Sequence, residues 1–235
     1  MSRYVIDSQG LKENIEYIKE KAGVPVIGVV KGNGYGFGIC ELTKVLLENG
    51  IKAFAVTEVT DIPVLKEILS DENDILIMRS TCIEAEAKII AENGCIATIG
   101  SSEACRIMNE VSKKLGVKTK CHLKIDTGMG RYGFMPSQIQ EAIDCYKASN
   151  LEFCGIYTHF SSAFRNAELT KAQLTIFKDS ISQIQKAGYE TGVAHCSNSP
   201  ALLNVDGVSM DAVRIGSAFT GRVITCLLYT SDAAD

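Results

Sequence analysis

The sequence predicts an α/β protein that folds as a closed (β/α)8 barrel of the TIM type. Short β-branched runs alternate with amphipathic helical stretches along the whole chain, and such alternation builds parallel strands joined by right-handed crossovers. Eight of these units within about 200 residues favour a closed barrel over an open sheet. No G-x-G-x-x-G follows a predicted strand, which argues against a dinucleotide-binding domain.

Each element follows from a local pattern. The expected strands, in chain order, are residues 26–30, 53–57, 75–78, 96–99, 119–125, 153–158, 190–195 and 211–215. Helical spacing of apolar residues is clear in two of the intervals: one runs through Ile107, Met108, Val111 and Leu115, and the other through Leu174, Phe177, Ile181 and Ile184. Gly116 and Gly188 are the expected C-caps of these two helices.

Composition narrows the function. The 235 residues are 46% hydrophobic and 22% charged, enough to bury a large core, and the net charge is -4 with no concentrated basic stretch. A nucleic-acid or anionic-membrane surface is therefore not expected. Nine cysteines without a C-x-x-C pair fit neither a metal site nor a disulfide framework, and the chain shows no signal peptide or apolar spanning segment. We expect a reduced, cytoplasmic protein.

The C-terminal residues do not continue the pattern. From about Thr225 the sequence CLLYTSDAAD resembles a translated sequencing adapter. We therefore expect a barrel domain over residues 1–222, a non-native tail over residues 223–235, and a natural protein that is longer than this chain.

Reactive or ion-pairing side chains stand where several predicted strands end. These residues are Lys31, Arg79, Asp126, His159, His195 and Arg214. In a barrel the carboxyl ends of all strands face one mouth, so we expect these side chains to converge there.

Lys31 opens the segment KGNGYGFG, whose four glycines allow unusual backbone angles and close approach of a ligand. A lysine desolvated at the end of an apolar strand has a depressed pKa and becomes nucleophilic toward an aldehyde. This chemistry is what a Schiff base requires.

Five motifs in order now carry a resemblance. VVKGNGYGFG, KIDTGMGRYGF, YTHFSSA, HCSNSPA and DAVRIGSAFTG are similar to the motifs of alanine racemases, from Arg3 to about Gly221. The resemblance implies a pyridoxal 5'-phosphate-dependent isomerase that interconverts L- and D-alanine, a peptidoglycan precursor. The cofactor would be held as an internal aldimine on Lys31, which would also be the base on one face of the substrate Cα.

The resemblance implies the other site residues as well. Tyr35, Ser199, Gly216 and Ser217 match the positions that hold the cofactor phosphate, where neutral donors and backbone amides suit an anion. His159 matches the histidine packed against the pyridine ring, and Arg214 the arginine that faces the ring nitrogen. A guanidinium stays protonated, so it donates a hydrogen bond to that nitrogen without transferring a proton.

Two further basic residues carry expected roles. Arg131 matches the arginine that contacts the cofactor's phenolic oxygen and the substrate carboxylate, for which a forked guanidinium is suited. Lys124 matches a lysine that is carbamylated in many members. No metal site is expected.

The sequence also departs from the family. The usual Lys-Ala-Asp-Ala-Tyr-Gly-His-Gly reads Lys-Gly-Asn-Gly-Tyr-Gly-Phe-Gly from Lys31, and Arg165 follows YTHFSS in place of an acidic run. These changes leave open a racemase of another small amino acid, such as serine. The family's C-terminal β-domain, which supplies a tyrosine base across a homodimer interface, is expected to be missing, whereas racemisation needs a base on each face.

Two other functions stay open. A single-barrel protein that binds or buffers pyridoxal phosphate without turnover would share the barrel and the VRIG segment, although DTGMGR and KGNGYG match racemases better. A barrel without cofactor would leave the residues at the strand ends without a purpose.

Overall fold

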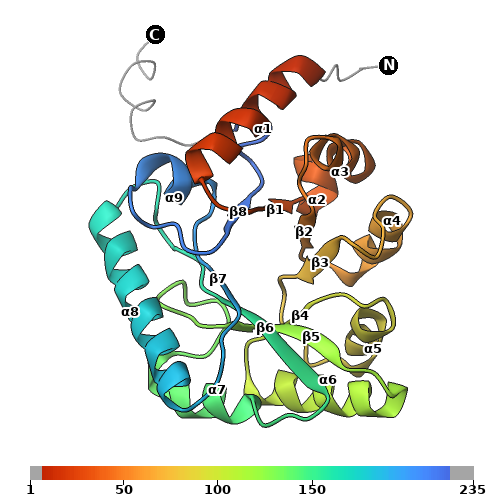
Figure 1. Cartoon of the computed structure of the whole chain (residues 1–235), viewed down its shortest axis with the longest axis vertical. Coiled ribbons are helices and arrows are strands. Elements are labelled where there is room, and N and C mark those ends of the chain that lie inside the picture. Colours follow the sequence, from red (N-terminus) through yellow and green to blue (C-terminus); the bar gives the residue numbers. More distant parts are fainter. Residues whose placement is uncertain (1–6, 223–235) are drawn as a thin grey trace.

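Eight parallel strands form the centre of the molecule, and helices surround them (Figure 1). The structure is a computed structural model that describes residues 7–222, so the expected tail over 223–235 lies outside the described residues. The strands are β1 (Val26–Val29), β2 (Ala53–Val56), β3 (Asp74–Ile77), β4 (Ala97–Ile99), β5 (Thr119–Lys124), β6 (Leu151–Tyr157), β7 (Val193–His195) and β8 (Val213–Ile215). Each overlaps a strand predicted from the sequence.

The strand order confirms the TIM-type α/β fold. One sheet has the order β3-β2-β1-β8 and the other β4-β5-β6-β7, and every pair within them is parallel. Single parallel bridges, Leu76 to Ile96 and His195 to Ala212, connect the two sheets at both seams. The carboxyl ends of all eight strands therefore point to one side of the ring.

Helices fill the crossovers between the strands. They are α1 (Ser8–Ala22), α2 (Lys31–Tyr35), α3 (Ile39–Glu48), α4 (Ile62–Lys66), α5 (Glu84–Glu92), α6 (Ser102–Leu115), α7 (Ile139–Cys145), α8 (Ala167–Lys186) and α9 (Ser199–Asn204), with short 3-10 turns η1 (Val59–Asp61) and η2 (Pro136–Gln138). None of these helices in the described part of the chain has both the length and the apolar character needed to cross a bilayer.

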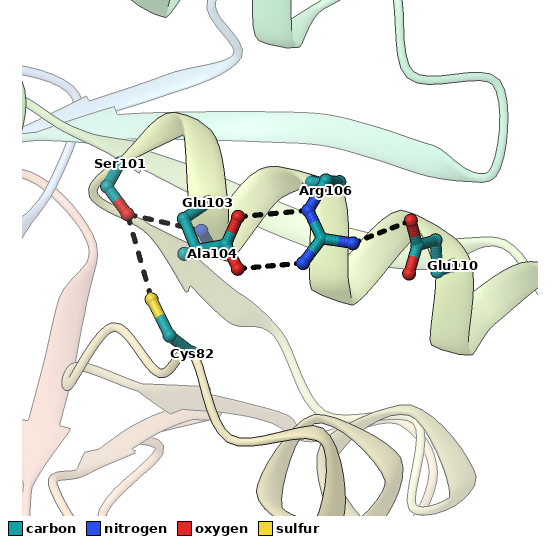
Figure 2. A network of polar contacts seen from close by, with 6 residues as sticks. All are labelled: Cys82, Ser101, Glu103, Ala104, Arg106 and Glu110. Carbon is teal, nitrogen blue, oxygen red and sulfur yellow. Dashed lines mark hydrogen bonds and ion pairs between the residues drawn. The ribbon is translucent and has the colours of Figure 1, made fainter.

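Helix α6 shows how the sequence sets the ends of a helix. The Ser101 hydroxyl accepts the amide of Ala104 at the N-terminus, and Gly116 takes a left-handed conformation (φ 69°) at the C-terminus, as predicted. On its solvent face Arg106 lies between Glu103 and Glu110, with N–O distances of 2.7 and 2.8 Å (Figure 2). Intrahelical pairs of this kind support a helix only modestly.

Several element boundaries differ from the sequence prediction by one to three residues, and two of them lie at glycines. Helix α8 ends at Lys186 with Ala187 as its C-cap, and Gly188 adopts its positive φ of 89° one residue later. Strand β7 begins at Val193 rather than at residue 190, because Gly192 is left-handed (φ 63°) and cannot continue an extended strand. A Cβ atom at Gly192 would meet the carbonyl oxygen of Cys154 at 2.1 Å, so the backbones touch there.

The barrel interior has an apolar half and a polar half. Alternate residues of a strand share a face. Six buried apolar residues on or beside the strands pack together and fill the first half: Ile27, Val29, Ala55, Leu76, Ile96 and Ala212. Buried polar side chains occupy the other half: Thr98, His122, Lys124, Tyr157, His195 and Arg214. Buried polar groups must be paired, so the second half of the barrel is a hydrogen-bonded network.

Candidate active site

A cavity of about 410 Å³ opens at the carboxyl ends of the strands. Eight residues predicted from the motifs all line it: Lys31, Tyr35, Arg131, His159, Ser199, Arg214, Gly216 and Ser217. These residues come from both ends of the described chain, and the barrel brings them to one mouth because it places every strand end on the same rim.

Lys31 and Tyr35 reach the cavity from a left-handed turn. Gly32, Asn33 and Gly34 have φ angles of 60°, 51° and 61°, and Tyr35 itself has a φ of 56°. Only glycine adopts this region without steric cost, and asparagine tolerates it better than most residues. The Asn33 side chain accepts the amide of Ile39 at 3.0 Å, which ties the turn to the start of α3.

Burial and the charge of Arg131 lower the pKa of the Lys31 amine. Both effects disfavour the ammonium form, because desolvation penalises a charge and a neighbouring cation repels another. The structure therefore makes Lys31 a better nucleophile and base than an exposed lysine.

Neutral donors gather at one end of the cavity, around the end of β8. The Ser199 hydroxyl lies 3.3 Å from the amide of Gly216 and 3.4 Å from that of Ala218. A Cβ atom at position 216 would lie 2.2 Å from the Tyr35 hydroxyl, so the glycine is what lets the phenol approach the backbone. Burial raises the pKa of Tyr35 to about 12, which keeps it a donor.

Arg214 lines the cavity and is only 3% exposed. Its guanidinium donates to the backbone carbonyl oxygens of Thr158, His195 and Cys196, at 2.7, 3.0 and 3.3 Å, and lies 2.7 Å from Nδ1 of His195. The whole strand-end environment thus fixes the plane of this group.

His159 lies beside Arg214 and is neutral. Its Nδ1 is 3.5 Å from the Arg214 guanidinium, and its Nε2 is 3.3 Å from the amide nitrogen of Asn198. Burial, together with the positive charge of Arg214 and further cations, lowers the pKa of His159 to about 3. The ring can therefore pack against a ligand without carrying a charge.

Asp126 does not line the cavity, although the sequence places it at a strand end. Its carboxylate accepts the backbone amides of Gly128, Met129, Gly130 and Arg131 at 2.7–3.1 Å. Burial alone would raise its pKa, but these amides, together with Lys124, lower it. Asp126 thus holds the loop that carries Arg131.

Lys124 lies beneath the cavity rather than in its lining. Its Nζ donates to the carbonyl oxygen of Ile125 at 2.8 Å and stands 5.6 Å from the ring centres of both Tyr132 and Tyr157. Burial is the main cause that lowers the pKa of Lys124 to about 7. Its amine is accordingly neutral in part near neutral pH, which carbamylation requires.

The sequence reasoning missed several lining residues. Tyr132 and Tyr157 both donate their hydroxyls to the carbonyl oxygen of Met78, the second at 2.8 Å. Arg79, noted only as a strand end, pairs with Glu86 at 2.8 Å and with Glu58 at 3.4 Å at the rim. Tyr157 could have been found from the strand alternation, since it lies two residues before His159.

His195, also expected at the rim, lies behind Arg214 instead and is fully buried. His195 pairs in register with Tyr157 of β6, and both side chains are buried inside the barrel. The six strand-end residues therefore divide into four that line the cavity and two that support the others.

Comparison with known proteins places this arrangement in context. A family model for the N-terminal domain of alanine racemases matches residues 6–223. The chain is 31% identical over 221 residues to the alanine racemase of Methanococcus maripaludis, covering 92% of this chain and 59% of that protein. It is equally 31% identical over 224 residues to the alanine racemase of Treponema denticola, covering 92% and 58%.

Solved structures agree. Alanine racemase of Clostridium difficile 630 superposes with a TM-score of 0.86 at 28% identity, over 95% of this chain and 58% of that one. Alanine racemase of Bacillus anthracis with bound L-Ala-P superposes with a TM-score of 0.86 at 26% identity, over 97% and 61%. The chain thus spans less than two thirds of the length of these relatives.

Proposed function

The chain belongs to the alanine racemase family through its N-terminal domain, and from this premise we propose that it binds pyridoxal 5'-phosphate at Lys31 and takes part in interconverting L- and D-alanine. The observation that carries the proposal is that one cavity gathers all eight motif residues around an amine whose pKa is lowered. Relatives at about 30% identity carry the name alanine racemase, which supports the same activity.

The residues present fit this cofactor. Its phosphate would lie against the hydroxyls of Tyr35 and Ser199 and the backbone amides near Gly216 and Ser217. None of these four groups is a carboxylate that would repel the phosphate. Its aldehyde would meet Lys31, and its ring nitrogen would face Arg214. The absence of a Cβ at Gly216 lets the Tyr35 hydroxyl lie close to that backbone, which gathers the neutral donors that would hold an anion.

When bound, the cofactor withdraws electrons from the substrate and acidifies its Cα–H bond. Lys31 then removes or returns the proton on one face, because its lowered pKa makes a neutral amine accessible. Arg131 would orient the substrate carboxylate through its forked guanidinium. Arg214 would face the ring nitrogen as a hydrogen-bond donor that keeps its own proton, and a ring held in this way would favour return of the Cα proton over side reactions.

We extend the proposal to the whole protein on the sequence grounds given above. It would act in the cytoplasm as a homodimer on a small amino acid, without nucleic acid or membrane as a partner. The partner subunit's second domain would supply the base on the opposite face of Cα.

A labelling experiment tests the cofactor assignment. The 235-residue chain is incubated with pyridoxal phosphate, reduced with borohydride and digested, and the modified peptide is identified by mass. We expect the label on Lys31, its loss in Lys31→Ala, and its retention in Lys44→Ala, a substitution on α3 outside the cavity. A label that persists in Lys31→Ala would contradict the assignment.

A second experiment separates a racemase from a cofactor carrier. Hydrogen exchange at Cα needs only one base, so L-alanine in D2O should gain deuterium in the presence of the loaded chain. L-Serine, assayed in parallel, tests the other substrate that the altered loop leaves open. Cofactor labelled on Lys31 without exchange on either amino acid would favour the carrier.

A further inference from the structure

Three side chains form a continuous hydrogen-bonded line through the polar half of the barrel. Arg214 of β8 lies 2.7 Å from Nδ1 of His195 on β7, and Nε2 of His195 lies 2.8 Å from Nδ1 of His122 on β5. The line starts in the cavity described above. It ends at a second, smaller cavity of about 290 Å³ that His122 lines together with Ile27, Lys120 and Asp211.

The protons on this line have only one consistent arrangement. A guanidinium is always a donor, so Nδ1 of His195 must be the unprotonated acceptor. His195 then carries its hydrogen on Nε2 and donates it to Nδ1 of His122. His122 in turn must carry its hydrogen on Nε2, and all three donors point in the same direction, away from the first cavity.

Any other arrangement places two donors against each other. A hydrogen on Nδ1 of His195 would face the Arg214 N–H at 2.7 Å, and a charged His122 would face the His195 N–H at 2.8 Å. Burial, reinforced by the charge of Arg214, lowers the pKa of His122 to about 3 and holds the pKa of His195 well below that of a free imidazole, so both rings are neutral. These contacts therefore hold each histidine in a single neutral tautomer and do not carry protons along the line. We call this arrangement the tautomer lock.

The backbone around His122 is shaped to hold the ring in this place. The pairing of β5 with β6 shifts between Cys121 and His122, so Cys154 bulges and Gly155 becomes the partner of His122. A Cβ atom at Gly155 would lie 2.4 Å from Nε2 of His122. The bulge and the glycine together create the room that the imidazole occupies.

Arg214 depends on this lock for one of its contacts. Three of its other acceptors in the described residues are backbone carbonyl oxygens, which accept in any state, and Nδ1 of His159 lies farther away at 3.5 Å. His195, at 2.7 Å, accepts only as one tautomer. We propose that His122 is a positioning residue: by accepting the N–H of His195 it holds the tautomer that fixes the Arg214 guanidinium. The consequence at the cofactor ring rests on the proposed function, while the tautomers do not.

The first test uses the unaltered 235-residue chain without cofactor. The chain has only three histidines, so long-range ¹H–¹⁵N spectra can be assigned from His159→Gln and His122→Asn. We expect both His122 and His195 to carry hydrogen on Nε2 and a bare Nδ1. A hydrogen on Nδ1 of either ring would overturn the proposal, whatever the protein catalyses.

The second test uses two substitutions of similar shape. Asparagine at position 122 keeps an acceptor close to where Nδ1 lies, and leucine does not. We expect His122→Asn to keep the His195 tautomer and His122→Leu to release it into a mixture. In the loaded chain, His122→Leu should weaken pyridoxal phosphate binding about fivefold, the typical effect of one lost hydrogen bond, and His122→Asn should not.

Each outcome of the comparison decides the matter. If both variants keep the tautomer, or if both lose it equally, His122 contributes only packing and the proposal fails. If His122→Leu does not fold, the spectra of the unaltered chain still show whether His122 and His195 have the expected tautomers. If the unaltered chain binds no cofactor while its tautomers are as expected, the proposed function fails and the lock remains.

Discussion

Burial is the main cause that lowers the pKa of the Lys31 amine, and the positive charge of Arg131 adds to it. The second cause yields a prediction about pH. Replacing Arg131 by leucine removes a positive charge, so the pKa of Lys31 should rise toward that of an exposed lysine. The rate of borohydride-fixed labelling depends on the neutral amine, so its pH midpoint should move upward. Arg165→Leu changes an exposed guanidinium and should leave the midpoint in place. An unchanged midpoint in Arg131→Leu would show that burial alone sets this pKa.

Arg214 contributes to stability as well as to the site. Arg214→Met would leave the carbonyl oxygens of Thr158, His195 and Cys196 buried without this donor. Unpaired buried polar groups are costly, and we expect a loss of about 3 kcal/mol or more in the free energy of unfolding. Urea unfolding of the cofactor-free chain measures it without a contribution from ligand binding.

Arg106→Met is the control for this measurement. Arg106 also makes several ion pairs, but it does so in solvent on α6 (Figure 2). Exposed pairs contribute little, so its removal should hardly change the unfolding midpoint. If both substitutions lowered the free energy of unfolding equally, burial would not be the reason that Arg214 contributes to stability.

At the scale of the element, the left-handed turn α2 decides where Lys31 and Tyr35 point. Alanine at Gly32 would meet nothing within 4 Å, so only the backbone angle opposes it, at about 1–2 kcal/mol. Alanine at Gly34 has the same angle and would also press on Ile39 and Leu42, whose atoms lie at 3.2 and 3.3 Å. We expect Gly34→Ala to be the more destabilising.

Urea unfolding and Lys31 labelling can be read on both glycine variants. Gly34→Ala should also lower the extent of labelling, because the turn would shift against α3 and carry Lys31 with it. If the two variants lose equal stability, the contact with α3 plays no part. The turn would then be set by backbone preference alone.

At the scale of the whole molecule, the cavity holds one well-placed base on the described chain. Tyr132 and Tyr157 both donate to the Met78 carbonyl, and burial raises the pKa of Tyr35 to about 12, so these phenols are poorly suited to accept a proton. Of the other lining groups, Glu58 pairs with Arg79 at the rim, and burial with nearby cations lowers the pKa of His159 to about 3. Lys31 is therefore the best-placed base on the described chain. The site should therefore exchange the Cα hydrogen of a substrate on one face more readily than it inverts the configuration at Cα.

We therefore predict that the 235-residue chain, loaded with pyridoxal phosphate, exchanges the Cα hydrogen of L-alanine faster than it forms D-alanine. D-Alanine formation should be at least about a hundredfold slower than in the longer alanine racemase of Methanococcus maripaludis, because one general base is worth about 10² to 10⁴ in rate. Both proteins are assayed in D2O at equal cofactor occupancy. Comparable D-alanine formation would mean that the described barrel supplies its own second base.

The sequence by itself determined the eight strands, the barrel and the family. The alternation of residue types reports local periodicity, and periodicity fixes which elements form and on which rim the strand ends meet. Five ordered motifs also named eight of the residues that line the cavity. Local signals placed the cap at Gly116 correctly and misplaced the start of β7, because the obstacle at Gly192 is a contact with Cys154, which is distant in sequence.

Only the tertiary structure decided what the remaining polar residues do. Asp126 turned out to brace the Arg131 loop, and His195 to lie behind Arg214. The link from His195 to His122 spans 73 positions and depends on a bulge that sets the register of β5 against β6. A contact of this kind follows from strand pairing and side-chain direction, which a pattern of neighbouring residues does not contain, since a shift of one residue turns every side chain to the other face.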